Sequence, residues 1–232
     1  MRFCNYHILR IYFLALSCIL YSCKKSTVDP VAIDKAYFPL QTGKYIIYDV
    51  DSIAYSNFFN STDTFSYQIK EMVDSPYMDA SNQTAYAIIR SVRADENSPW
   101  ILKDIWSANL TDHTAEKVEE NLRFIKLDFP VLLNKTWKGN SLINTDSSLL
   151  YLKDWDYEYT EVNTIITVDT MQFDSVVTVT QLNEQNVIQK MIFVEKYARS
   201  IGLIYKEQQN IETQPGQYLN GYILTMIIRE YN

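Results

Sequence analysis

Residues 64–73 read Thr-Phe-Ser-Tyr-Gln-Ile-Lys-Glu-Met-Val, and this stretch decides the fold. Large apolar side chains occupy positions 65, 67 and 69, whereas polar side chains occupy positions 66, 68 and 70. Successive side chains of a β-strand point to opposite faces of a sheet. The period of two therefore predicts a strand with one dry and one wet face.

The same period recurs along most of the chain. It predicts further strands at 44–53, 84–93, 100–110, 136–143, 161–169, 173–181, 187–197, 201–208 and 218–231. Residues 183–186, Asn-Glu-Gln-Asn, are typical of a hairpin loop. Only residues 114–121, Thr-Ala-Glu-Lys-Val-Glu-Glu-Asn, favour a helix, with Thr114 as its N-cap. We expect an all-β fold of about ten to twelve strands, either an antiparallel β-sandwich or an open, half-open or closed barrel.

The first 23 residues have the features of a bacterial lipoprotein leader. Residues 1–10 carry two arginines and no acid, and the uncharged, mostly apolar run 11–21 is too short for a membrane span. The run ends in Leu-Tyr-Ser-Cys, which is similar to the site where a signal peptidase cuts before a lipidated cysteine. We predict a signal peptide at 1–22, lipidation of Cys23, a tether through residue 35 and a β-rich domain over 36–232. An ordinary secretory signal or a short anchor helix with an incidental cysteine is the alternative.

Charge and composition restrict the partners of the mature chain. Without residues 1–22 it has 210 residues, with 19 Lys and Arg against 28 Asp and Glu, a net charge of −9. An acidic chain without a basic patch repels phosphate backbones, so we expect no nucleic-acid partner. The lipid would attach the domain to the outer membrane. No early acidic pair follows Cys23, which favours the periplasmic face over the cell surface.

Two segments of the chain resemble each other. Residues 37–44, Tyr-Phe-Pro-Leu-Gln-Thr-Gly-Lys, and residues 128–135, Asp-Phe-Pro-Val-Leu-Leu-Asn-Lys, both join Phe-Pro to a Gly or Asn followed by Lys. Gly and Asn tolerate a positive φ, which suits a turn that leads into a strand. The domain is thus either two related β halves, with a boundary near residue 127, or a domain that reuses a common turn.

The chain resembles Bacteroidetes-type envelope lipoproteins of unknown function. The resemblance rests on residues 38–48, which contain Phe-Pro-Leu-x-x-Gly-Lys-x-x-x-Tyr, on Trp-Lys-Gly-Asn at 137–140 and on Tyr-Ala-Arg-Ser-Ile-Gly-Leu-Ile-Tyr at 197–205. It implies an envelope location and a β fold. It implies no substrate and no catalytic residue.

Few residues suit catalysis or metal binding. After Cys23 the mature chain has no further cysteine, and His113 is its only histidine. A His/Cys zinc site therefore cannot be assembled from one chain. A Ser-His-Asp triad would have to use His113, which lies in a polar stretch typical of a surface turn. Five scattered glycines exclude a Gly-rich phosphate loop. We expect no catalytic residue, no metal and no cofactor.

Residues 154–159, Asp-Trp-Asp-Tyr-Glu-Tyr, alternate acids with aromatic rings. On a strand the acids share one face and the rings share the other. The simplest interpretation is a solvated acidic face with Trp155, Tyr157 and Tyr159 in the core. The same rings are also the best candidates for a ligand-binding platform, for example for a sugar. A calcium site and a pair of catalytic carboxylates are the remaining alternatives.

Three functions follow from these observations. The first is a lipid-anchored envelope binding or accessory module without catalytic activity, whose partner is a glycan, a lipid or another envelope protein. The second is a carrier of a lipid or other apolar ligand in a barrel cavity. The third is a carboxylate-dependent glycan hydrolase.

Overall fold

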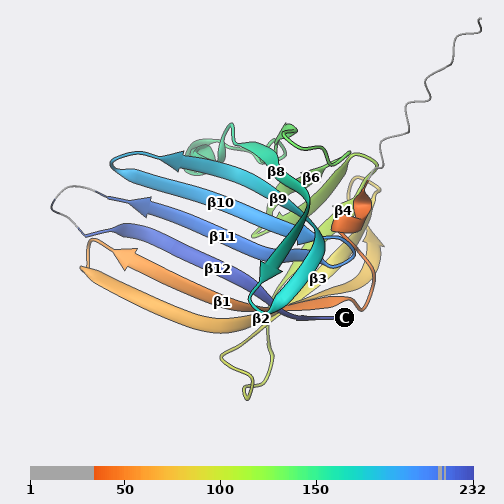
Figure 1. Ribbon diagram of the computed structural model, residues 1–232, viewed down its shortest axis with the longest axis horizontal. Helices are drawn as coiled ribbons and strands as arrows, with labels where there is room; N and C mark the ends of the chain where they lie inside the picture. The colour runs from red at the N-terminus through yellow and green to blue at the C-terminus, as the bar shows by residue number, and fades with distance from the viewer. Residues whose placement is uncertain (1–33, 214–215, 217) are drawn as a thin grey trace, which may run out of the picture. The chain divides into compact units, whose positions relative to one another are not determined.

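The computed structural model describes residues 34–213, 216 and 218–232. The predicted leader, Cys23 and most of the tether lie outside these residues. The described chain forms one sheet of twelve antiparallel strands (Figure 1) and two short 3-10 helices, η1 and η2. The strands are β1 (Tyr45–Ser56), β2 (Ser61–Met78), β3 (Thr84–Arg93), β4 (Ile101–Leu110), β5 (Thr114–Glu119), β6 (Leu122–Asp128), β7 (Thr136–Lys138), β8 (Asp156–Val168), β9 (Met171–Gln185), β10 (Gln189–Ala198), β11 (Gly202–Glu212) and β12 (Asn220–Tyr231); η1 spans Lys35–Tyr37 and η2 spans Ser147–Leu152.

The sheet is a nearly closed barrel made of two meanders of six strands. The strand order is β6-β5-β4-β3-β2-β1-β12-β11-β10-β9-β8-β7, so β1 and β12 join the two meanders at the middle of the sheet. The edge strands β6 and β7 meet where the Ile125 N–H donates to the Gly139 carbonyl (2.8 Å) and the Trp137 Nε1–H donates to the Ile125 carbonyl (2.9 Å). We call this meeting line the seam. The all-β class and the barrel alternative are confirmed, and the sandwich alternative is not.

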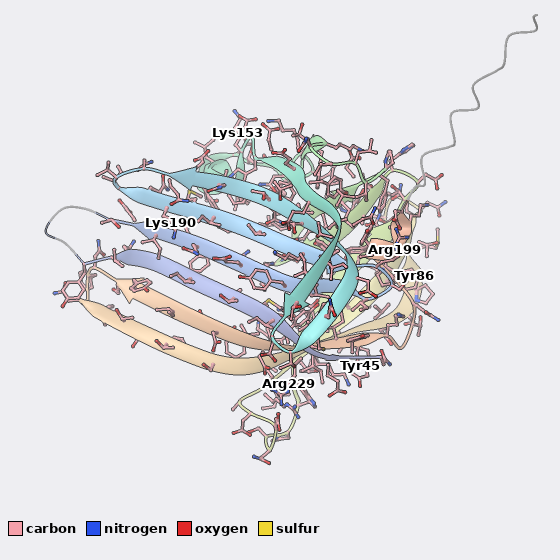
Figure 2. All side chains as sticks on the ribbon, in the orientation of Figure 1. Tyr45, Tyr86, Lys153, Lys190, Arg199 and Arg229 are labelled. Carbon is pink, nitrogen blue, oxygen red and sulfur yellow. The ribbon has the colours of Figure 1, made fainter. Side chains whose placement is uncertain are left out.

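The barrel has two distinct ends, which Figure 1 shows at left and right. The tip end carries the β1–β2 and β9–β10 connections, the end of β11 and the start of β12, and Lys190 lies near it in Figure 2. The base end carries η1 and the β10–β11 turn, where Arg199 lies. There the Ser200 N–H donates to the Ala36 carbonyl, and Arg199 forms a bidentate ion pair with Asp34. These contacts hold the start of the described chain against the base end.

The β8–β9 hairpin bends across the outer face of the sheet (Figure 1). Three register shifts interrupt its pairing, and Asn163 within β8 has a φ of 55°. Irregular pairing of this kind bends a strand and increases its twist. The bend is fixed by Tyr37, whose hydroxyl donates to Asn163 Oδ1 at 2.6 Å. Under the hairpin, Phe173, Val176 and Ile204 form a second core outside the barrel.

Three local predictions were wrong. Residues 114–121 are not helical but form β5 and a turn, because Glu116 and Lys117 are buried in the sheet and not solvated on a helix. The hairpin loop predicted at 183–186 begins later, since Asn183 to Gln185 still pair with β10. The strand predicted at 136–143 ends at Lys138, after which the chain leaves the sheet toward η2.

The two Phe-Pro segments have the same local geometry. Gly43 and Asn134 both have a positive φ, 89° and 62°, as the sequence predicted. Gly43 N–H donates to the Val73 carbonyl on β2, and Asn134 N–H donates to the Tyr159 carbonyl on β8. Each turn is thus hydrogen-bonded to the second strand of its own meander. Each segment thus begins a six-stranded meander. That the two halves are related stays a prediction.

Candidate functional site

The alternation at 154–159 places the aromatic rings inside the barrel. Trp155 is 6% exposed, Tyr157 is 1% exposed and Tyr159 is fully buried. The acids stay outside, where Asp156 forms a surface ion pair with Lys138 at 2.8 Å. The predicted strand faces are therefore correct.

The three aromatic side chains make different contacts. Tyr159 belongs to the seam, where its hydroxyl accepts the Asp128 N–H at 3.0 Å and its ring lies 4.6 Å from that of Trp137. Tyr157 packs against Gly139 and donates to Asn140 Oδ1, and Trp155 donates to the Tyr151 carbonyl. Trp155 and Tyr157 also line a pocket in the barrel, so the structure brings two of the three predicted ligand residues together. No ligand contact has been observed for any of them.

A chain of buried ion pairs crosses the barrel interior. Its first part lies within the first meander, where Arg90 on β3 pairs with Glu71 on β2 (2.9 Å) and with Asp104 on β4 (2.9 Å). Glu71 also accepts a 2.7 Å bond from Lys117 on β5. Lys117 in turn lies 3.8 Å from Glu119.

The second part of the chain joins the two meanders. Lys126 on β6 bridges Glu119 and Glu195, each at 3.0 Å, and Lys206 on β11 reaches the same two carboxylates at 3.2 and 3.3 Å. Tyr197 on β10 donates a 2.5 Å bond to Glu195. Glu195 is 1% exposed and Lys126 is 3% exposed. We call these residues the ion network: Glu71, Arg90, Asp104, Lys117, Glu119, Lys126, Glu195 and Lys206.

The ion network favours the charged forms of its carboxylates and of Lys126, as the direction of their pKa shifts indicates. Burial alone would raise the pKa of Glu195 and of Glu119, but the nearby ammonium groups of Lys126 and Lys206 outweigh it and lower both pKa values. Burial would lower the pKa of Lys126, and the two carboxylates outweigh it and raise that pKa. Because the network has four cations and four anions, it carries no net charge.

Two small cavities lie on either side of the ion network. The base-end cavity measures about 80 Å³ and lies between Phe38, Pro39 and Leu40 at its rim and Glu71 and Lys117 below. The second cavity, which we call the tip-end pocket, lies on the tip-end side of the network and measures about 210 Å³. Both cavities reach Glu119, so the network is their common floor.

Aromatic rings and amides line the tip-end pocket. Its walls come from β6, η2, β8, β9, β10, β11 and β12, and most of its lining residues fall into two sets, with Leu122 and Leu152 beside them. The aromatic set is Phe124, Tyr151, Trp155, Tyr157, Phe193 and Tyr222, and the amide set is Gln181, Gln208 and Asn210. Glu119 and Lys126 close its floor.

Gln181 is the unusual member of this lining. Its side chain is 3% exposed, yet its Nε2 has no hydrogen-bond partner in the described structure. A buried amide without a partner costs on the order of 1–3 kcal/mol. Nε2 itself has almost no accessible surface, so it reaches a pocket occupant only when the side chain rotates toward the pocket that Gln181 lines. Such a rotation toward an acceptor would offset this cost.

The ion network and Gln181 were not predicted from the sequence, although signals for both were present. On β10 the inward positions read Met191, Phe193, Glu195 and Tyr197, so a carboxylate stands in an apolar series. On β9, Gln181 continues the buried series of Val177 and Val179. A polar residue at a core-facing position is the pattern that could have found them.

Other candidate groups lie elsewhere. His113 is exposed in the turn between β4 and β5. Among the described residues, no group of three or more His, Cys, Asp or Glu is arranged to hold a metal ion. In the same part of the chain no helix is long and apolar enough to cross a membrane.

Comparisons with known proteins give a distant structural likeness. No protein-family model matches the sequence, and no curated protein is significantly similar to it. A Bacteroides fragilis protein, described as a predicted exported protein with a YmcC-like fold, is similar at a TM-score of 0.45 and 13% identity, over 84% of this chain and 98% of its own. A predicted lipoprotein of Parabacteroides distasonis is similar at a TM-score of 0.39 and 10% identity, with the same coverage. At these scores the likeness carries no argument about function.

Proposed function

We propose that this protein is a lipid-anchored binding or accessory module of the bacterial envelope, without catalytic activity. The observation that carries the proposal is the tip-end pocket, which combines six aromatic rings with three side-chain amides above a neutral floor. Small-molecule sites have this character, with mostly apolar walls and a few placed polar groups. The anchor at Cys23, the outer membrane and its periplasmic face are the sequence predictions that place the pocket at the envelope.

The packed interior argues against a lipid carrier. The ion network fills the middle of the barrel, and the cavities on either side measure about 80 and 210 Å³. Drug-sized ligands occupy about 300–1,000 Å³. A membrane lipid would therefore have to break buried ion pairs, which costs about 3–5 kcal/mol for each unpaired charge.

The carboxylates argue against a hydrolase. Asp156 is exposed and paired with Lys138, on the opposite face of β8 from the pocket. Glu119 is the carboxylate that lines the pocket, and the ammonium groups around it hold its pKa well below the usual value. A general acid requires a raised pKa. The pocket thus favours binding.

The anchor is tested by metabolic labelling with palmitate. The wild-type protein should be labelled and should sediment with membranes, whereas Cys23→Ala should be unlabelled and soluble after export. A Cys4→Ala variant is the matched control, because its cysteine lies in the predicted leader, and it should behave as wild type. Equal membrane retention of Cys23→Ala would contradict the anchor.

The binding role is tested by photo-crosslinking in living cells. A benzophenone side chain replaces Tyr151, which is 57% exposed and lines the pocket, or Tyr231, which is 43% exposed at the end of β12. We expect a specific adduct from position 151 and none from position 231. Equal adducts from both positions, or none from position 151, would contradict a binding role for the pocket.

A further inference from the structure

The unpaired amide of Gln181 restricts what the tip-end pocket can bind. An alkyl chain in the pocket would leave Nε2 without an acceptor, so the cost of burying that amide would remain. A ligand with hydroxyl groups offers acceptors to Nε2, and its hydroxyls also donate to amide oxygens. Gln208 and Asn210 add two more amides of the same chemistry to the lining.

The neutral floor excludes a charged ligand. Lys126 is already shared between Glu119 and Glu195, and Glu119 is shared among three lysines. An anion or cation in the pocket would gain no free counter-charge there, yet it would lose its hydration. The occupant is therefore uncharged.

The size and the closed floor restrict the ligand further. About 210 Å³ lies below the lower limit of drug-sized pockets, so there is room for one ring-sized group. The ion network blocks passage beyond it, so an elongated molecule can insert only its end. Trp155, Phe193 and Tyr222 provide ring surfaces that suit the C–H faces of such a group.

We propose that the tip-end pocket binds a neutral pyranose sugar, either free or as the terminal residue of a glycan, and that the Gln181 side chain rotates toward it so that Nε2 donates a hydrogen bond to one of its oxygens. This inference rests on the binding role proposed above and names the chemical class of the ligand. Gln181 is a specificity-determining residue of the pocket, because it is the buried amide of the lining that has no partner within the protein.

The test is an NMR titration of the side-chain amide signals of the complete β domain. The probes are the methyl glycosides of glucose, galactose, mannose and N-acetylglucosamine, with octanol as the apolar alternative. We expect at least one glycoside to shift the Gln181 signal with saturation. In Gln181→Leu the affinity for that glycoside should fall about tenfold, the loss expected for one buried hydrogen bond.

Matched variants on β11 separate the pocket from the rest of the surface. Gln208 lines the pocket, whereas Gln209 bonds to Glu207 outside it. Gln208→Leu should weaken glycoside binding, and Gln209→Leu should leave it unchanged.

Unfolding of Gln181→Leu should occur at or above the wild-type temperature, because an unpartnered buried amide is replaced by an apolar group.

Three results would overturn the sugar assignment. They are the absence of a shift with all four glycosides, equal affinity in Gln181→Leu, or saturable binding of octanol in place of the glycosides. If a crosslinked adduct at position 151 persists alongside one of these results, the binding role stands with another ligand. If the adduct is also absent, both proposals fail.

Discussion

Glu195 shows how one side chain can depend on the whole interior. It is 1% exposed, and its carboxylate is satisfied by Lys126, Lys206 and Tyr197, which come from three strands. A buried ion pair adds little net stability over an apolar pair, but removal of one partner leaves the other charge buried without a counter-charge. Glu195 is therefore tolerated in the barrel interior only because its three partners lie within bonding distance there.

We predict that Glu195→Ala lowers the free energy of unfolding by about 3–5 kcal/mol, since two ammonium groups lose a counter-charge. Urea denaturation measures the change. Asp156→Ala is the control, because it removes a carboxylate from an exposed ion pair worth at most about 1 kcal/mol. If Glu195→Ala is too unstable to purify, Glu195→Gln tests the same charge with the size retained. Similar losses for the Glu195 variants and Asp156→Ala would contradict the buried role of Glu195.

At the scale of elements, the turns that begin each meander were predictable and β5 was not. The Phe-Pro segments carry their conformation locally, in a Gly or Asn that accepts a positive φ. β5 instead buries Glu116 and Lys117, whose partners lie on other strands. The local sequence gives no sign of those partners. The charged residues of 114–121 therefore favoured a solvated helix.

We predict opposite effects of two substitutions in the turn before β7. Asn134 has a φ of 62°, where a β-branched residue is strained by about 1–2 kcal/mol. Asn134→Val should therefore lower the free energy of unfolding by that amount, and Asn134→Gly should leave it unchanged or raise it. Gly43→Ala, at φ 89° with nothing within 4 Å of the added Cβ, should show the backbone cost alone. Equal stability of Asn134→Val and Asn134→Gly would contradict this account.

At the scale of the whole molecule, two features convert a twelve-stranded sheet into a barrel. The seam joins the edge strands β6 and β7 through Ile125, Gly139 and Trp137. The ion network joins the two meanders across the interior through Lys126 and Glu195. The seam joins residues that lie close in the sequence, whereas the ion network joins strands that are far apart along the chain.

We predict that Trp137→Phe loosens the seam. The substitution removes the Nε1–H bond to the Ile125 carbonyl, which is worth about 1 kcal/mol, and keeps an aromatic ring beside Tyr159. Amide hydrogen exchange should accelerate along β6 and β7 while β1 and β12 stay protected. Uniform acceleration in all four strands would show that the seam does not open by itself.

The ion network also predicts a stability plateau between about pH 5 and pH 10. The pKa values of Glu119 and Glu195 are lowered on folding, so their stabilising contribution is present above the unfolded value of about 4.5 and is lost as the pH falls through the folded pKa. The pKa of Lys126 is raised, so its contribution is complete below its unfolded pKa and is lost as the pH rises through the folded pKa. Burial also raises the pKa values of Tyr48 and Tyr157, which opposes folding in alkali once these residues ionise in the unfolded chain.

Unfolding temperatures measured from pH 3 to pH 11 check this plateau. The wild-type temperature should fall on both sides of it. In Glu195→Gln the fall on the acid side should be shallower, because one of the shifted carboxylates is absent. An acid limb of equal steepness in the two proteins would contradict the role of Glu195.

The sequence by itself determined the β class, most of the strands, the faces of residues 154–159 and the two positive-φ turns, because alternation and turn chemistry are local properties of the chain. Only the tertiary structure decided that β5 is a strand and that the sheet closes. It also decided that Glu71, a charged residue at the next position of the dry face of residues 64–73, lies in the interior. A charge can occupy such a position only when opposite charges from distant strands meet it there. The tip-end pocket has the same origin, since its lining gathers residues from eight elements that no stretch of sequence places side by side.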